Sequence, residues 1–133
     1  SLDINVKRTK FLARIKDNNK IFLIGSNGKL TPIEYKDKSK YLPFIFGKPE
    51  IDQFLKFKTI IDNSKFEYKD INNIFFFLSD RWDIQLKNDI LIKLPSKNIK
   101  KTLDLVSDFL LENKNDNIKI LDARIQNQII LND

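Results

Sequence analysis

Two segments in the second half of the chain carry apolar residues at every second position. Residues 82–87 and 90–94 place apolar side chains at every second position, starting from Trp82, and the polar pair Asn88-Asp89 separates them. A period of two is that of a β-strand with one buried face, and a short polar link between two such strands indicates a hairpin. Because a lone hairpin is only marginally stable, we expect other elements of the same domain to cover its apolar face, with Trp82 in the core.

The rest of the chain supplies such elements. Turn signals separate short apolar runs, which predict strands, and two stretches with helical spacing predict helices. The expected strands are residues 4–6, 11–15, 21–24, 29–33, 71–78, 118–125 and 128–131, and the expected helices begin at Pro49 and after an N-cap at Ser96. Pro32 favours a sheet edge for its strand. This order indicates an α+β domain with a mostly antiparallel sheet and two principal helices.

The composition excludes several kinds of site. The 133 residues include no Cys and no His, which removes thiol nucleophiles, Cys-ligated metals and the commonest general base. The three glycines do not form a phosphate-binding loop. We therefore expect no catalytic residue, no metal and no cofactor. No stretch approaches the roughly 20 apolar residues that cross a bilayer.

Two other functions remain open as alternatives. The net charge of +6 permits a nucleic-acid-binding module, although the lysines are scattered and the aromatic residues lie in apolar runs. Asp80 and Asp83 flank the strand of Trp82 and could act as an acid–base pair on a glycan. However, Asp83 is expected on a polar face beside Gln85. Trp82 could also be a binding anchor and residues 42–47 a recognition loop, but the pattern favours the core and a buried connection.

Several motifs follow one another in an order known from one protein family. In chain order they are Ile4-Asn5-Val6 with Phe11-Leu12-Ala13-Arg14, a strand and glycine turn at 22–28, Leu42-Pro43-Phe44-Ile45-Phe46-Gly47, Arg81-Trp82-Asp83 before the alternating strand, an amphipathic helix at 96–111, and Asp122-Ala123-Arg124 before a final hairpin. In these motifs and their spacing the chain resembles the β-domain of the FtsQ/DivIB family of bacterial cell-division proteins.

The resemblance implies a division of the chain and a cellular role. Residues 1–10 would be a remnant of the last strand of a POTRA module with its linker, and residues 11–133 the FtsQ-type β-domain. In the family this domain lies in the periplasm, and one N-terminal helix, absent from this sequence, anchors the protein in the inner membrane. The domain is a non-enzymatic scaffold that recruits the coiled-coil division proteins FtsB and FtsL and, through them, the septal peptidoglycan synthase.

The candidate partner-binding site is the final hairpin. Its last strand is expected at a sheet edge, where unpaired N–H and C=O groups could accept a partner strand. Apolar side chains would contact the partner on both faces, and Arg124 could hold a partner carboxylate in a bidentate pair. The alternative buries the apolar residues and pairs Arg124 with Asp122. We expect Lys or Pro at Ile130 to abolish binding without unfolding the domain. The candidate residues are Arg124, Ile125, Asn127, Gln128, Ile129, Ile130 and Leu131.

Overall fold

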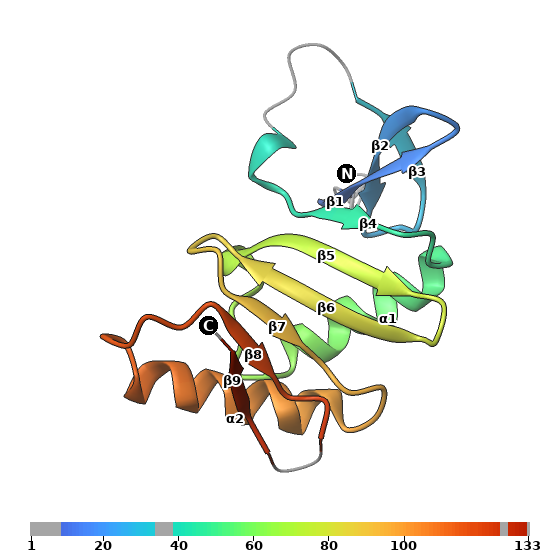
Figure 1. Ribbon diagram of the computed structural model, residues 1–133. Helices are drawn as coiled ribbons and strands as arrows, with labels where there is room; N and C mark the ends of the chain where they lie inside the picture. Colours follow the sequence, from blue (N-terminus) through green and yellow to red (C-terminus); the bar gives the residue numbers. More distant parts are fainter. Residues whose placement is uncertain (1–8, 34–38, 126–127, 133) are drawn as a thin grey trace, which may run out of the picture.

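The computed structural model describes residues 9–33, 39–125 and 128–132 (Figure 1). Within these residues nine strands form one sheet in the order β3-β2-β1-β4-β5-β6-β7-β8-β9. The predicted α+β class with a mostly antiparallel sheet is confirmed, whereas the strand expected at 4–6 and the turn at 126–127 lie outside the described residues. The strands are β1 (Phe11–Asp17), β2 (Lys20–Gly25), β3 (Leu30–Pro32), β4 (Phe44–Phe46), β5 (Ile71–Phe77), β6 (Arg81–Leu86), β7 (Leu91–Lys93), β8 (Ile120–Asp122) and β9 (Ile130–Asn132).

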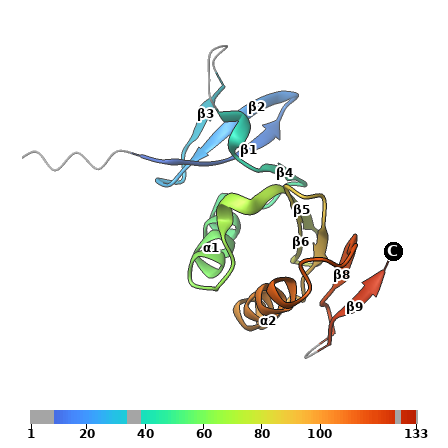
Figure 2. The ribbon, with the colours of Figure 1, turned by 90° about the vertical axis from the view of Figure 1, so that its left-hand side faces the viewer.

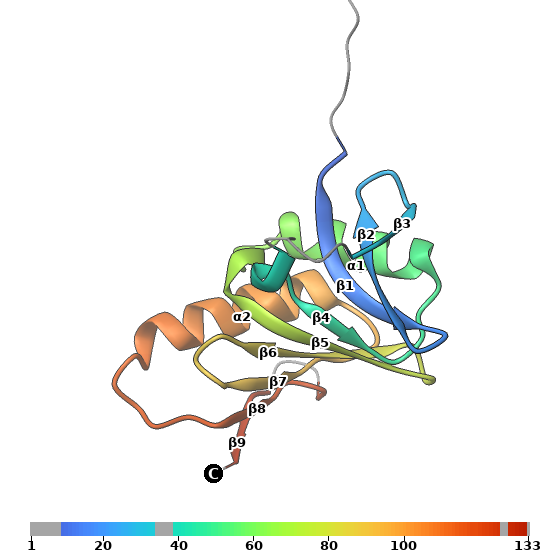
Figure 3. The same ribbon diagram turned by 90° about the horizontal axis from the view of Figure 1, so that it is seen from above.

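Two α-helices cover one face of the sheet and leave the other face without a helix. Figures 2 and 3 show α1 (Ile51–Asp62) and α2 (Ile99–Glu112) side by side on the same side of the strands. The short 3-10 turns η1 (Ser39–Tyr41) and η2 (Tyr68–Asp70) lead into β4 and β5. α1 begins after Glu50, whose backbone N–H donates to Gln53 Oε1 at 2.8 Å, so Pro49 precedes the helix and does not begin it.

The core lies between this helical layer and the sheet. Trp82 of β6 is 5% exposed, and its ring stacks on Phe57 of α1 with the centroids 4.4 Å apart and the planes 3° from parallel. The ring of Phe76 in β5 contacts the same indole, with the ring centroids 4.7 Å apart. The predicted core position of Trp82 is therefore confirmed. Its side chain packs the alternating strand against the first helix.

The segment 42–47 forms a central part of the sheet. β4 lies between β1 and β5 and pairs in parallel with both. Pro43 and Ile45 are buried, as a connecting role predicts. Gly47 ends the strand with φ at 99°, and a Cβ there would lie 2.4 Å from the carbonyl oxygen of Phe76. Only glycine allows the chain to leave β4 so close to the backbone of β5.

The strand expected over residues 118–125 is shorter than predicted, because local hydrogen bonds limit it at both ends. The N–H of Ile118 donates to the carbonyl of Asp116 in a turn. The N–H of Arg124 donates to Oδ1 of Asp122 at 3.1 Å instead of to a neighbouring strand. β8 therefore consists of three residues.

Two further boundaries differ from the prediction. The last strand, expected over 128–131, begins two residues later because the N–H of Gln128 donates to the carbonyl of Ile125 at 3.1 Å and not to β8. The second helix is capped by Asn98 and not by Ser96. Asn98 has φ at 58°, a left-handed conformation that asparagine tolerates better than most residues.

Candidate partner-binding edge

The last strand of the chain is also the last strand of the sheet. β9 pairs antiparallel with β8, and in this register Asp122 lies opposite Ile130 and Leu121 opposite Leu131. No other strand of the described residues lies on the far side of β9. Figure 1 and Figure 3 show it at the margin of the sheet. One backbone edge of β9 therefore faces away from the sheet.

The hydrogen bonds of β8 determine which of its groups face β9. The N–H of Leu91 donates to the carbonyl of Lys119, and the N–H of Ala123 donates to the carbonyl of Lys93, both at 2.9 Å. Backbone groups alternate in direction along a strand. The backbone N–H and C=O groups of residues 119, 121 and 123 therefore point toward β7, and those of residues 120 and 122 point toward β9.

This alternation assigns the outward groups of β9. Ile130 and Asn132 lie opposite residues 122 and 120, so their N–H and C=O groups face β8. The N–H and C=O of Leu131 face outward. Proline at Ile130 would thus break the β8–β9 pairing itself, which means that the substitution expected to test binding also disturbs the fold. Leu131 is the position that separates the two effects.

The opposite edge of the sheet, β3, presents an interrupted row of outward donors, the N–H of Leu30 alone. The carbonyl of Lys29 accepts a hydrogen bond from the N–H of Gly25, and the N–H of Ile33 donates to the carbonyl of Ile21. The backbone groups of the odd-numbered residues of this segment therefore point toward β2. The outward positions of β3 include Pro32, which has no N–H. The edge position predicted for Pro32 is confirmed. Of the two edges, β9 is the one with a complete backbone for strand addition.

The side chains of the final hairpin offer apolar surface on both faces of the sheet. Ile130 shares the helix-free face with Asp122 and is exposed. Leu131, on the face of the helices, is 49% exposed at the edge. Ile129 is partly buried against the core. Ile125 and Gln128 are exposed in the connection before β9.

Arg124 is held by Asp122 in a bidentate pair. Its Nε donates to Oδ1 at 2.8 Å and its Nη2 to Oδ2 at 2.6 Å. The hydrogen bonds from Arg124 lower the pKa of Asp122, and the carboxylate raises the pKa of Arg124. Nη1 makes no hydrogen bond within the described residues, so the end of the guanidinium remains available to another carboxylate. Asn127, the remaining candidate residue, lies outside the described residues.

A row of charges crosses the helix-free face beside this pair. Asp83, Lys93 and Asp122 are cross-strand neighbours on β6, β7 and β8. Asp83 lies on the helix-free face, as the polar pattern predicts. It is nevertheless buried and not solvated, and its carboxylate forms an ion pair with Arg81. Burial raises its pKa against the opposing effect of Arg81. Lys93 was not among the candidates, although its position between the core residues Ile92 and Leu94 indicates that its side chain lies on the opposite, helix-free face.

Replacing Arg81 by methionine is expected to destabilise the domain by about 2 kcal/mol, because Asp83 stays buried without its partner. The pKa of Asp83 should then rise further, so the folded state holds a proton that the unfolded state releases near pH 4. Stability should therefore fall as the pH rises above about 4. Urea unfolding across this pH range measures the effect, with Arg81→Lys as the control. A pH profile unchanged from the parent would contradict the assignment.

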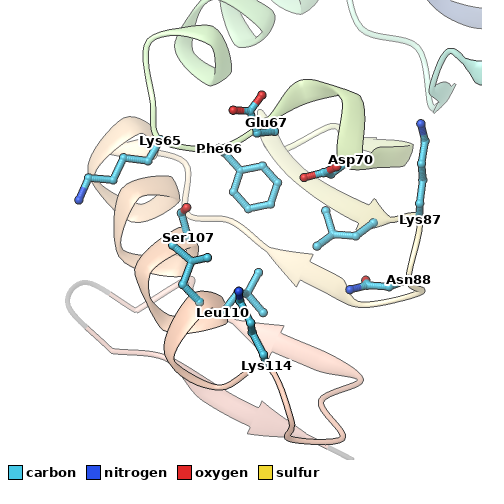
Figure 4. Close-up of a pocket in the computed structure, with 11 residues that line it drawn as sticks. Lys65, Phe66, Glu67, Asp70, Lys87, Asn88, Ser107, Leu110 and Lys114 are labelled. Atoms are coloured by element: carbon cyan, nitrogen blue, oxygen red, sulfur yellow. The ribbon is translucent and has the colours of Figure 1, made fainter.

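A groove of about 620 Å³ lies between η2, the β6–β7 turn and α2 (Figure 4). Phe66 and Leu110 contribute apolar surface to it. Its rim carries charges of both signs, including Lys87, Lys114 and Glu67. A rim with charges of both signs does not favour a ligand of either charge.

The described residues contain no group of three or more His, Cys, Asp or Glu side chains that could hold a metal ion. None of the helices in these ranges is both long and apolar enough to span a bilayer. The feature best suited to binding is the backbone edge of β9 with the Arg124–Asp122 pair beside it. Fold and edge together define an α+β domain whose sheet ends in an open edge strand.

Comparison with known proteins identifies the family. The sequence model described as "Cell division protein FtsQ/DivIB, C-terminal" matches residues 13–124. The chain belongs to this family of bacterial cell-division proteins, whose role is that of a division scaffold. The fold is similar to the major extracytoplasmic domain of the trans isomer of DivIB from Geobacillus stearothermophilus, with a TM-score of 0.57 and 13% identity over 83% of this chain and 98% of that one. A search of curated proteins finds no match.

Proposed function

We propose that this domain recruits FtsB- and FtsL-type coiled-coil proteins to the divisome by accepting a partner strand along β9. The observation that supports this most strongly is the outward N–H and C=O of Leu131 on an edge strand that contains no proline. Strand addition takes its affinity from such main-chain groups and its specificity from alternate side chains. Ile130 and Leu131 would contact the two faces of the added strand.

Arg124 adds a charge-specific contact to this mode of binding. Asp122 occupies the Nε side of the guanidinium and holds its orientation, which leaves the two-nitrogen end to pair with a partner carboxylate. An acidic residue of the partner beside the added strand would therefore fix its register. This arrangement combines the two alternatives considered for Arg124, since one arginine can serve both carboxylates.

The cellular setting belongs to the same proposal. Family membership supports a protein anchored in the inner membrane by one N-terminal helix, with this domain in the periplasm and a POTRA module before it. There the domain would connect assembly of the division site to septal peptidoglycan synthesis without catalysing a reaction itself. The extracytoplasmic position of the DivIB domain with the same fold is consistent with this setting.

Titration calorimetry of the 133-residue chain with the periplasmic segments of FtsB and FtsL tests the proposal. We expect saturable binding with one partner segment per domain. Arg124→Ala should weaken it by about tenfold, as expected for the loss of one charge-assisted contact. Absence of heat and of co-purification with both segments would overturn the proposed function.

A further inference from the structure

A second surface with binding character lies on the helix-free face, at the other end of the sheet from β9. A groove of about 880 Å³ runs over β1, β2 and β4. We call it the aromatic groove and define it by Lys16, Ile21, Phe44, Phe46 and Lys48. The registers of β1 with β2 and β4 place the side chains of Lys16, Ile21 and Phe44 on the helix-free face, away from buried Ile15 and Ile45. Neither helix covers this surface.

The aromatic rings of the groove, exposed at Phe46 and partly exposed at Phe44, are held in place by their neighbours. Phe46 is 46% exposed, although its ring stacks on Phe75 with the centroids 5.0 Å apart and lies 4.9 Å from Phe44. The guanidinium carbon of Arg14 lies over the ring of Phe44, 5.7 Å from its centroid. A ring fixed by its neighbours loses little conformational freedom when a ligand covers it, so it is suited to anchor an apolar side chain.

The charge of the groove has one sign. Lys16 and Lys48 are exposed at its rim, and the ion pairs found within residues 9–33, 39–125 and 128–132 include neither of them. Among the described residues that line it there is no Asp or Glu. In this it differs from the groove beside α2, which carries both signs.

We propose that the aromatic groove binds an acidic segment of a partner protein that carries aromatic or aliphatic side chains. The two lysines complement the acidic residues and the rings receive the apolar ones. A nucleic acid is less suited, because phosphate recognition draws on many cations and this groove presents two. A membrane surface is less suited, because the exposed apolar side chains of the groove are few, Ile21 and Phe46. This interaction goes beyond strand addition at β9 and does not depend on it.

Fluorescence anisotropy with a fluorescein-labelled peptide, in which Asp and Glu alternate with Phe and Leu, tests the proposal on the full chain. We expect saturable binding that weakens at least about tenfold in the double variant Lys16→Glu, Lys48→Glu and about tenfold in Phe46→Ser. Matched controls are Lys56→Glu with Lys101→Glu on the helices, and Phe11→Ser, which alters a phenylalanine of similar exposure, 42%, outside the groove. The controls should bind within about twofold of the parent. Circular dichroism confirms that each variant is folded.

Several outcomes would overturn the proposal. These are equal binding of a peptide with Lys in place of Asp and Glu, equal loss in the control variants, and preferential binding of phosphatidylglycerol vesicles or oligothymidylate through the same residues. Leu131→Pro should leave the affinity of the acidic peptide unchanged. Loss of peptide binding in that variant would locate the peptide at β9 and would contradict a separate surface.

Discussion

Replacing Trp82 by alanine will lower the free energy of unfolding by about 3 to 5 kcal/mol. The indole is the contact between β6 and α1, where it stacks on Phe57, and it also touches Phe76 of β5. Truncation removes both aromatic contacts and leaves a cavity between the sheet and the helical layer, which the stacked ring of Phe57 cannot fill without moving α1. The loss should lower the melting temperature by roughly 10 to 20 °C for a domain of this size.

Urea unfolding followed by far-ultraviolet circular dichroism measures this effect, because Trp82 is the only tryptophan and its fluorescence is lost in the variant. Leu78→Ala is the matched control. Leu78 is 98% exposed in the turn after β5, so its removal should change the free energy of unfolding by less than about 0.5 kcal/mol. Equal effects of the two substitutions would contradict the core position of Trp82.

Replacing Leu131 by proline will weaken binding of the partner segments by roughly 100-fold or more, about 2.7 kcal/mol. The substitution removes the outward N–H, which costs one ladder hydrogen bond and leaves a partner carbonyl without a donor. The fold should tolerate it, because the inward hydrogen bonds of β9 come from Ile130 and Asn132. Ile130, the residue before the new proline, already has the extended conformation that proline requires of its neighbour.

The titration with the FtsB and FtsL segments provides the measurement. Leu131→Ala keeps the N–H and loses only side-chain contact, so its affinity should fall by less than about tenfold. Both variants should keep the melting temperature of the parent within a few degrees, since β9 is exposed throughout. If alanine weakens binding as much as proline does, the side chain and not the backbone carries the interaction.

The parts of the fold that could be predicted are those in which neighbouring residues decide the structure. The alternation around Trp82 and the turn at Asn88-Asp89 determine the β6–β7 hairpin without reference to the rest of the chain. Pro32 likewise indicates an edge strand through its own missing N–H. The helical spacing of the apolar residues predicts both helices. The second helix begins later than expected because its N-cap is Asn98 and not Ser96.

Long-range pairing could not be predicted in the same way. Nothing in residues 44–46 indicates that they pair in parallel with two strands distant in sequence. The apolar run 74–78 has no period, so it does not reveal that Phe75 points to the helix-free face while Ile74 enters the core. The aromatic groove was missed for this reason, since its rings occupy alternate positions of runs that appear uniformly apolar in the sequence.

The candidate site was predictable in position but not in geometry. The order of the last strand suggested an edge, and the register then decided that Leu131 and not Ile130 presents its backbone outward. The sequence also treated the Arg124–Asp122 pair and a partner contact as alternatives. The bidentate geometry uses one side of the guanidinium only, so both are compatible.

Amide hydrogen exchange at Leu131, with and without the periplasmic segments of FtsB and FtsL, tests strand addition most directly. In the free domain the Leu131 amide should exchange almost as fast as in an unfolded chain, because its N–H has no partner in the sheet. Saturation with the partner should slow this exchange at least about 100-fold and leave the outward amide of Leu30 on β3 unchanged. A Leu131 amide that still exchanges rapidly in the saturated complex would contradict binding through the backbone of β9.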